Sequence, residues 1–412
     1  MKSVIVSTVR TPIGNFGGTL RTVPAYDLAA IVLNEAIERA DLKPESVDIV
    51  IMGQNYQNGE YVNIARMGLL TAGWPVDIVG ITNDRRCPSG LDAICLASMA
   101  IESGNAAIVV AGGVESMSTA EFYIKGDIRW GMGGSGDMPK GHGSLTTWGM
   151  PLYDRALRGR VMSQPEERFG IVSSMMTWAE AAATEHGITR EEVDSWALLS
   201  NQRACAAIES GLFKGEIVSV PVPQRKGEPL LFSQDERPRA DTTIDALAKL
   251  KPVMGGVCTA GNSCGENDGA SACVIMSEKE AEKYQLQSNA YLKGFAFSGS
   301  DPRYAWRAAT SAVKKVFQKT GLSLKDMDLI EIHEAFAAQA LANFRELGLS
   351  EKDYDRINVN GSCVSLGHPL GATGARIMTT LTHEMRRRDA RYGLIAMCGG
   401  GGMGVASIIE KI

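Results

Sequence analysis

Four side chains that could together carry out acyl transfer lie near opposite ends of the sequence: Cys87, His333, His368 and Cys398. A thiolate is a good nucleophile toward a thioester, and an imidazole within reach can remove the thiol proton. A second thiol could exchange a proton on the carbon beside a thioester carbonyl. This set of groups predicts carbon–carbon bond chemistry on thioesters.

Cys87 stands after Arg85 and Arg86 and before Pro88, where a helical pattern begins that continues to Glu102. A sulfur atom near the positive end of a helix dipole is stabilised as a thiolate, so we expect a lowered pKa for this thiol. A small buried cysteine is the alternative interpretation, and the proline and glycine at this corner argue against it.

Both histidines lie in motif-like strings, His333-Glu-Ala-Phe-Ala337 and Gly367-His-Pro-Leu-Gly-Ala-Thr-Gly374. The glycines of the second string let the backbone approach a ligand closely, and the proline suits a helix start. We therefore expect His368 to be the base for Cys87.

Cys398 ends an apolar stretch and is followed by four glycines, 399–402. Backbone N–H groups in such a segment can stabilise a developing oxyanion. A phosphate-binding loop is disfavoured because no lysine follows. The string Gly261-Asn-Ser-Cys-Gly265 matches a serine-hydrolase nucleophile elbow, but a strand-like run follows it where such an elbow needs a helix.

Composition excludes several classes of protein. The 412 residues carry a net charge of -5, which gives no general attraction to nucleic acid. The eight cysteines are scattered, with no zinc-site spacing, so we expect neither a metal nor disulfides. No signal-peptide pattern and no run of about 20 apolar residues is found, which predicts a cytoplasmic protein without a membrane span.

A weak internal repeat indicates two similar halves. Residues 33–50 and 313–330 both read as an amphipathic helix, a turn and a buried strand, with Leu42 matching Leu322 and Asp48 matching Asp328. In one copy Cys87 stands at a strand-to-helix corner, and in the other His368 does. If the halves pack about a pseudo-twofold axis, these two side chains face each other.

The pattern along the chain predicts α/β architecture. We expect an N-terminal half from residues 1–120 plus 258–279, an insertion over 121–257, and a C-terminal half over 280–412. The insertion contains glycine-rich loops, two amphipathic helices over 175–186 and 190–210, and a charged, proline-bearing stretch. We expect it to cap the site.

These strings together resemble the thiolases, the acetyl-CoA acyltransferases. The resemblance extends over essentially the whole chain and includes, besides the four motifs above, Arg10-Thr-Pro-Ile-Gly14, Gly112-Gly-Val-Glu-Ser-Met117, Asp235-Glu-Arg-Pro-Arg239 and Thr259-Ala-Gly-Asn262. It implies two βαβαβαββ halves in αβαβα layers with an inserted loop domain that binds CoA, in dimers or tetramers.

The resemblance also implies roles. Cys87 would become acylated, His368 would activate it, and Cys398 would exchange the α-proton of acetyl-CoA. His368 and a water held by His333 would form one oxyanion hole, and the backbone N–H groups of Cys87 and Gly400 the other. The implied CoA contacts are Arg225, Lys226, Met175 and Ser263, and CoA and acetyl-CoA would be substrates, with no tightly bound cofactor.

Some positions depart from the family pattern. His333 stands where many thiolases have asparagine, a variant that resembles long-chain thiolases of fatty-acid β-oxidation complexes, so membership of such a complex stays open. Ala305-Trp-Arg-Ala308 replaces a glycine-rich loop beside the acyl pocket, and we expect Trp306 to reshape that pocket.

Two alternatives remain. One is another condensing enzyme, either a decarboxylating enzyme that resembles a ketoacyl synthase or an enzyme that resembles hydroxymethylglutaryl-CoA synthase. A ketoacyl synthase needs no cysteine base, so Cys398 favours a thiolase. The other is a non-catalytic acyl-CoA-binding subunit of a complex, which the retained set of reactive groups disfavours.

Overall fold

The computed structural model describes residues 2–126, 152–170 and 175–412. The N-terminal half contains β1 (Ser3–Arg10), β2 (Gly14–Asn15), α1 (Ala25–Arg39), β3 (Ile49–Gly53), α2 (Ile64–Thr71), β4 (Val79–Asn83), α3 (Ser89–Glu102), β5 (Ile108–Ser116), β10 (Asn267–Ser277) and α9 (Glu278–Lys283). The C-terminal half contains β11 (Ala290–Gly299), α10 (Arg307–Thr320), β12 (Leu329–Ile332), α11 (Ala337–Leu347), α12 (Cys363–Leu366), α13 (Leu370–Arg388), β13 (Tyr392–Gly399) and β14 (Met403–Lys411).

Between β5 and β10 lie β6 (Phe122–Tyr123), β7 (Tyr153–Asp154), α4 (Arg155–Val161), α5 (Glu166–Phe169), α6 (Met176–His186), α7 (Arg190–Glu209), β8 (Val220–Val222), β9 (Leu230–Phe232) and α8 (Ile244–Ala248). The two predicted amphipathic helices are α6 and α7. Thr189 and Glu192 form a capping box that starts α7. Residues 127–151 and 171–174 of the predicted insertion lie outside the described residues.

Within the described residues, ten strands form one mixed sheet in the order β12-β13-β14-β11-β1-β10-β5-β3-β4, with β2 beside β10. The two halves of the sheet meet where β1 pairs with β11 through only two residue pairs, Val4 with Tyr291 and Ile5 with Ala290. Outward from β1, the pairs β1–β10 and β10–β5 are antiparallel and the pair β5–β3 is parallel. Outward from β11, the pairs β11–β14 and β14–β13 are likewise antiparallel and the pair β13–β12 is parallel. The strand β10 returns the chain to the N-terminal half.

The predicted repeat is visible in matching hydrogen bonds. The Asp48 carboxylate accepts from the backbone N–H groups of Ala107 and Ile108 at 2.7 and 3.0 Å. Its counterpart Asp328 accepts from the N–H groups of Arg391 and Tyr392 at 2.8 and 2.9 Å. Each aspartate therefore secures the start of the strand that follows the central helix of its own half.

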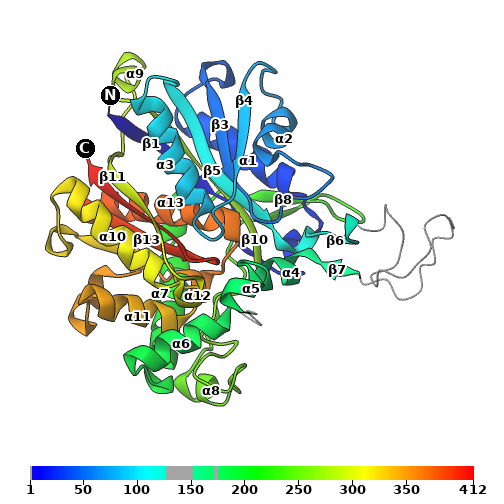
Figure 1. The fold of residues 1–412 in the computed structure, drawn as a ribbon. Coiled ribbons are helices and arrows are strands. Elements are labelled where there is room, and N and C mark those ends of the chain that lie inside the picture. Colours follow the sequence, from blue (N-terminus) through cyan, green and yellow to red (C-terminus); the bar gives the residue numbers. More distant parts are fainter. Residues whose placement is uncertain (1, 127–151, 171–174) are drawn as a thin grey trace.

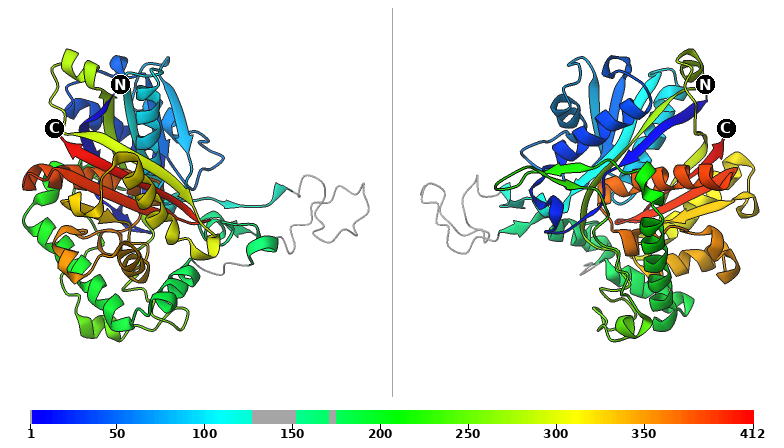
Figure 2. Two further views of the ribbon diagram at one scale, coloured as in Figure 1. Left: turned by 60° about the vertical axis from the view of Figure 1, so that its left-hand side comes forward. Right: turned by 180° about the vertical axis from the view of Figure 1, so that it is seen from behind.

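Helices and sheet form five layers (Figures 1 and 2). The helices α3 and α13 contact each other and both halves of the sheet, so they form the middle layer, with a core that includes Ile94, Ile275 and Ile377. The helices α1 and α2 cover the outer face of the N-terminal half, and α10 and α11 cover that of the C-terminal half. The predicted αβαβα arrangement is confirmed.

Glycines allow α3 and α13 to touch backbone to backbone at their first turns. A Cβ atom on Gly374 would lie 2.2 Å from the backbone nitrogen of Leu91, and one on Gly90 would lie 2.7 Å from the carbonyl oxygen of Gly371. Because real Cβ atoms do not approach so closely, a side chain at either glycine would separate the two helix starts. Cys87 and His368 stand just before these starts.

A buried arginine attaches the insertion to the first strand. The guanidinium of Arg10 donates to both carboxylate oxygens of Asp235, at 2.7 and 2.9 Å, and to Glu216 at 2.6 Å. Arg10 and Glu216 are fully buried, so these charge-assisted bonds are not weakened by water. They connect two motifs of the family resemblance that lie far apart in the sequence.

The close crossing predicts a clear effect for Gly374→Ala. The added methyl group overlaps the Leu91 backbone, so the protein should lose about 1–3 kcal/mol of unfolding free energy, measured by urea denaturation. Gly59→Ala is the matched control, because the one atom near its added methyl group is a Glu121 oxygen at 3.9 Å. Equal stability of the two variants would contradict the crossing.

Candidate active site

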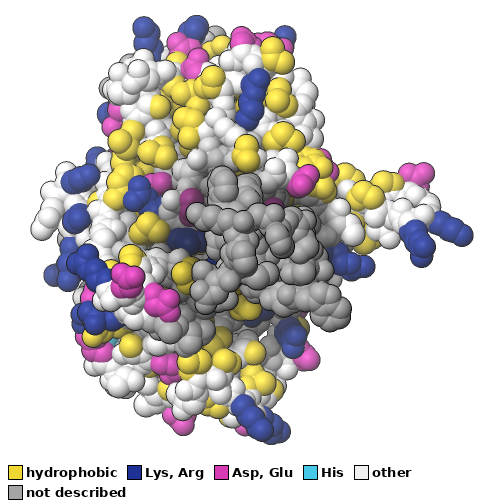
Figure 3. Space-filling view, turned by 45° about the vertical axis from the view of Figure 1, so that its right-hand side comes forward, with side chains coloured by type: hydrophobic (Ala, Val, Ile, Leu, Met, Phe, Trp, Pro, Cys, Tyr) yellow, Lys and Arg dark blue, Asp and Glu magenta, His cyan; other side chains and the backbone are white. Residues whose placement is uncertain are grey.

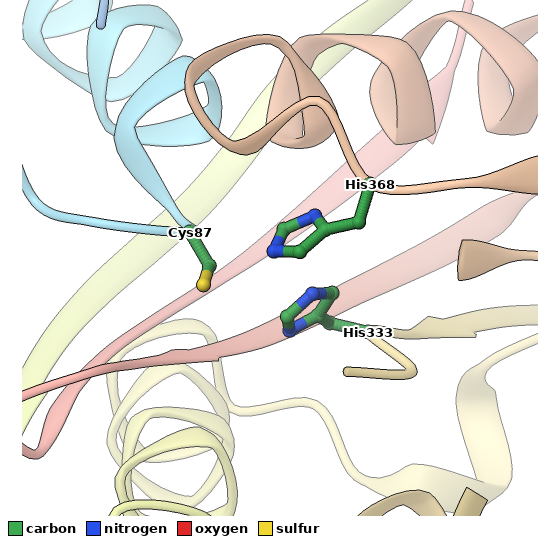
Figure 4. A group of neighbouring side chains, drawn as sticks. All are labelled: Cys87, His333 and His368. Atoms are coloured by element: carbon green, nitrogen blue, oxygen red, sulfur yellow. The ribbon is translucent and has the colours of Figure 1, made fainter. Parts of the chain in front are cut away.

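Three of the four predicted reactive side chains meet at one point. The ligand-forming atoms of Cys87, His333 and His368 lie within 4.8 Å of one another. The two imidazole rings are 4.5 Å apart between centroids, with 51° between their planes. Figure 4 shows the sulfur and both rings converging from three different segments. The convergence that the repeat predicted for Cys87 and His368 is present in the structure.

A strained turn presents the Cys87 thiol. Arg86 has a φ of 58°, a left-handed conformation that costs free energy for a residue with a side chain. The Ser89 hydroxyl stabilises the turn, donating to the Arg86 carbonyl at 2.6 Å and accepting from the Arg85 N–H at 2.8 Å. The turn ends where α3 begins, so the nucleophile stands at the predicted strand-to-helix corner.

Hydrogen bonds fix both the position and the tautomer of His368. Its backbone N–H donates to Asn267 Oδ1 at 2.8 Å, and its Nδ1 lies 2.7 Å from Thr373 Oγ1. The Thr373 hydroxyl donates its only proton to the Pro369 carbonyl at 2.8 Å, so it must accept a proton from Nδ1. Nε2 is left as the basic nitrogen, and it has no partner among the described residues.

His333 is fully buried and follows β12. Its neighbour Glu334 anchors the segment by accepting hydrogen bonds from Trp196, Ser200, Asn358 and the Val364 N–H. Burial lowers the pKa of His333 to about 3, and the Arg376 guanidinium acts in the same direction. Burial, then His333 and Arg376, hold the pKa of His368 well below its ordinary value. Both imidazoles are therefore neutral at physiological pH.

The expected lowering of the Cys87 pKa is wrong. Burial raises the pKa of Cys87 to about 12, and the nearby Cys363 thiol adds to the increase. Backbone N–H groups of Gly400 and Cys87 and the Arg86 charge oppose this increase but do not outweigh burial. Removal of the sulfur from water dominates over its place before a helix. The resting group is a thiol that needs a base.

Cys398 lies near enough to Cys87 for that thiol to affect its pKa, but it is outside the close group of Cys87, His333 and His368 and is not among the described residues that line the neighbouring cavity. Cys398 is buried at the end of β13, and burial, followed by the proximity of Cys87, holds its pKa well above the ordinary value. The Gly400 N–H and the Cys87 N–H both interact with the Cys87 sulfur, as two donors of an oxyanion hole would. These are the two N–H groups that the resemblance assigned to that hole.

A cavity of about 250 Å³ opens onto this group. Its wall includes Cys87, His368, Gly400 and the predicted CoA contact Met175. Ser263 is buried and donates to the Thr259 carbonyl at 2.7 Å, and its neighbour Cys264 lines the cavity instead.

The other two predicted CoA contacts, Arg225 and Lys226, are exposed in the turn between β8 and β9. Their contact with CoA, like that of Met175 and Ser263, remains a prediction.

Trp306 has a different role from the one expected. It is completely buried in the C-terminal core, packs edge-on against Tyr304, and is not among the described residues that line this cavity. The prediction that it reshapes the acyl pocket is therefore wrong for this cavity.

Among the described residues, Cys87, His333 and His368 are also the group whose ligand atoms are close enough to hold a metal ion. A thiolate and two imidazoles suit zinc, but the same groups are those that acyl transfer through a cysteine requires.

Sequence reasoning did not single out the residues that position the catalytic groups. Asn267 and Thr373 orient His368, and Glu115 accepts from the N–H groups of Asn55, Tyr56 and Gly371, which holds the start of α13 against the N-terminal half. Thr373 lies inside the His368 motif and Glu115 inside a string of the family resemblance. The partners of Asn267 and Glu115 are distant in sequence, whereas Thr373 bonds to His368 five residues away.

The raised pKa predicts how Cys87 reacts with iodoacetamide. With a pKa of about 12, the thiolate fraction grows in proportion to hydroxide, so alkylation should accelerate about tenfold per pH unit between pH 6 and 9. Cys87→Ala supplies the background from the other thiols. A rate that reaches a plateau below pH 7 would show a preformed thiolate and contradict this description of the site.

Thr373→Val should misorient the base. Loss of the hydroxyl removes the acceptor for Nδ1–H, so the tautomer that leaves Nε2 basic is no longer enforced. We expect transfer of an acyl group from a thioester to Cys87 at neutral pH to slow about tenfold or more, because that step needs Nε2 as its base. Thr373→Ser keeps the hydroxyl and should react at nearly the normal rate, and equal rates for the two variants would contradict the assigned tautomer.

Comparisons with known proteins agree with this geometry. The family model described as "Thiolase, N-terminal domain" matches residues 3–279, and "Thiolase, C-terminal domain" matches residues 286–411. An acetyl-CoA acetyltransferase of Chromobacterium violaceum is 42% identical over 100% of both chains. A beta-ketoadipyl-CoA thiolase of Acinetobacter baylyi is 43% identical over 99% of both. The crystal structure of the Bacillus anthracis acetyl-CoA acetyltransferase superposes with a TM-score of 0.91 at 41% identity, covering 100% of this chain and 99% of that one. The chain belongs to the thiolase family.

Proposed function

We propose that the protein is an acyl-CoA:acetyl-CoA C-acyltransferase that works through an acyl-Cys87 intermediate. It would cleave a 3-oxoacyl-CoA with free CoA, or run the reverse Claisen condensation. The proposal depends on one observation: the Cys87 thiol, the unpartnered Nε2 of His368 and the backbone of Gly400 meet at one cavity.

In the first half-reaction, Nε2 of His368 removes the Cys87 proton as the sulfur attacks the 3-oxo carbon. The N–H groups of Cys87 and Gly400 receive the negative charge on the carbonyl oxygen. The bond between the second and third carbons then breaks, and the Cys398 thiol gives its proton to the departing carbon. Acetyl-CoA leaves, and the acyl group remains on Cys87.

In the second half-reaction, the Cys398 thiolate takes the proton of an incoming CoA thiol. The CoA sulfur attacks the acyl-Cys87 carbonyl, and the Cys87 sulfur leaves and recovers its proton from His368. Both cysteines and the histidine return to their starting states. A water held by neutral His333 would join His368 in stabilising the enolate oxygen of acetyl-CoA.

The alternatives are not favoured by the relatives, which are named as acetyltransferases or thiolases. A decarboxylating enzyme would have no use for the buried Cys398 thiol near Cys87. A non-catalytic subunit would not need the tautomer that Thr373 enforces on His368.

An oligomer is also part of the proposal. The edge strand β4 and its neighbours expose large apolar side chains, including Leu70, Val76, Val79 and Ile81. Hydrophobic side chains are visible on the upper part of the face in Figure 3. An exposed edge strand with apolar side chains is a site for pairing with a second chain. We propose a homodimer or homotetramer on this basis.

The proposed substrates are CoA, acetyl-CoA and a 3-oxoacyl-CoA, without a tightly bound cofactor, and the exposed pair Arg225 and Lys226 would contact CoA phosphates. No helix of the described residues is long and apolar enough to cross a membrane. A cytoplasmic location and membership of a β-oxidation complex are further proposals, which fractionation and co-purification would test.

Variants of the two cysteines test the mechanism. Purified protein with a 3-oxoacyl-CoA and CoA should release acetyl-CoA, and Cys87→Ala should abolish this. Given acetyl-CoA alone, Cys398→Ala should still become acetylated on Cys87, because a CoA thiolate can leave without that proton. It should lose exchange of deuterium into the methyl group of acetyl-CoA, followed by mass spectrometry. Normal turnover of Cys398→Ala would refute the role of the second thiol.

A further inference from the structure

A cationic side chain lies in the wall of the acyl-transfer cavity. Most of the wall is apolar, with contributions from Tyr56, Met117, Leu157, Met176, Trp178, Phe336 and Leu370. Arg86, the residue that precedes Cys87, and the acidic residue Glu266 also line it. Arg86 is half-buried, and its guanidinium can form charge-assisted hydrogen bonds to an anion that enters the cavity.

The contacts of Arg86 place its charge on one side of the cavity. Its Nη1 lies 3.7 Å from where a Cβ atom on Gly159 would be, and a Tyr56 ring carbon lies 2.8 Å from the same point. The guanidinium therefore lies near Tyr56 and the helix α4. Met175, Met176 and Trp178 line the cavity from a different element, α6 and the residue before it.

The Arg86 guanidinium forms no ion pair with the carboxylates of the described residues, although the backbone N–H of Arg86 donates to Asp84 Oδ1 at 2.8 Å. None of the ion pairs among the described residues includes Arg86, and the side-chain hydrogen bonds found there do not include its guanidinium. Its neighbour Arg85 differs, because Arg85 pairs with Asp92 at 2.8 Å and lies over the Phe297 ring at 4.4 Å. Arg85 is therefore paired within the protein, whereas Arg86 lines the cavity.

We infer that Arg86 binds a carboxylate carried by the acyl group, and that the preferred substrates are 3-oxoacyl-CoA thioesters whose acyl chain ends in a carboxylate. This inference rests on the proposed function. A planar guanidinium can hold a carboxylate through two parallel hydrogen bonds. Because Arg86 and Cys87 are adjacent, a short acyl group on the sulfur brings its terminal carboxylate into the region of the guanidinium.

The reaction balances with such a substrate. For the CoA thioester of 3-oxohexanedioic acid, the Cys87 sulfur attacks the 3-oxo carbon, and the bond between the second and third carbons breaks. Acetyl-CoA leaves with a proton from Cys398, and a succinyl group stays on Cys87 with its free carboxylate. Free CoA then removes the succinyl group as its CoA thioester.

The experiment compares two substrates of equal chain length in each variant: the CoA thioester of 3-oxohexanedioic acid and 3-oxohexanoyl-CoA. The readout is the ratio of their kcat/KM values, in which any general loss of nucleophile reactivity cancels. The wild-type protein should prefer the carboxylate-bearing substrate. Arg86→Leu should lower the ratio about 10- to 100-fold, the usual range for a lost charge-assisted hydrogen bond.

Three further variants sharpen the result. Arg85→Leu removes the same charge one residue away, outside the cavity, and should keep the wild-type ratio. Arg86→Lys should retain part of the preference, since a lysine offers charge without the two-pronged geometry. Arg86→Gln lowers the ratio in the same way and serves if the leucine variant does not fold.

Several outcomes would overturn the inference. A preference of the wild-type protein for 3-oxohexanoyl-CoA would do so. An equal loss of kcat/KM with both substrates in Arg86→Leu would also do so, because Arg86 would then affect the reactivity of the Cys87 thiol. A change confined to the KM for free CoA would assign it to CoA phosphates, and an equal shift in Arg85→Leu would indicate a general charge effect. Absence of turnover with both substrates in the wild type would instead refute the proposed function, and this inference with it.

Discussion

The backbone contact between the first turns of α3 and α13 is the constraint on which the site depends. Gly90, Gly371 and Gly374 let two helices from opposite halves approach closer than any side chain would permit. Cys87 and His368 stand just before these turns, so the contact sets how near the sulfur and the imidazole can come. Glu115 strengthens the arrangement from the sheet side by accepting from the Gly371 N–H at 2.9 Å. The duplicated fold therefore supplies the proposed nucleophile from one copy and the proposed base from the other.

Burial determines the protonation states at that contact. It keeps both thiols protonated and both imidazoles neutral, so the site holds no fixed charge at its centre before substrate arrives. Proton transfer from Cys87 to His368 then has to coincide with attack, when the N–H groups of Cys87 and Gly400 can receive the new negative charge. A thiol that stays neutral in the resting state is also less exposed to oxidation and to alkylation. Burial therefore predicts a low reactivity of Cys87 before substrate binds, and the same burial would strengthen the hydrogen bonds to the oxyanion during acyl transfer.

Sequence patterns predicted the elements and the meeting of the halves, but not the environment of each group. The matching segments around Asp48 and Asp328 revealed the duplication, because each aspartate makes the same local bonds. The pKa of Cys87 was predicted in the wrong direction, since a helix dipole is visible in sequence whereas the depth of burial is set by distant segments. Trp306 was placed beside the acyl pocket by a local string, and the structure buries it in the core. The roles of Thr373 and Asn267 in orienting His368 were not predicted, because they depend on hydrogen bonds that form only in the folded chain.

The central claim is that Cys87 carries the acyl group within this convergence of two halves. The most direct measurement is peptide mass spectrometry of the protein after brief exposure to a 3-oxoacyl-CoA without free CoA. The peptide that contains Cys87 should gain one acyl mass, which should be lost again when CoA is supplied. An unmodified Cys87 peptide, or an acyl group located on another cysteine, would contradict it.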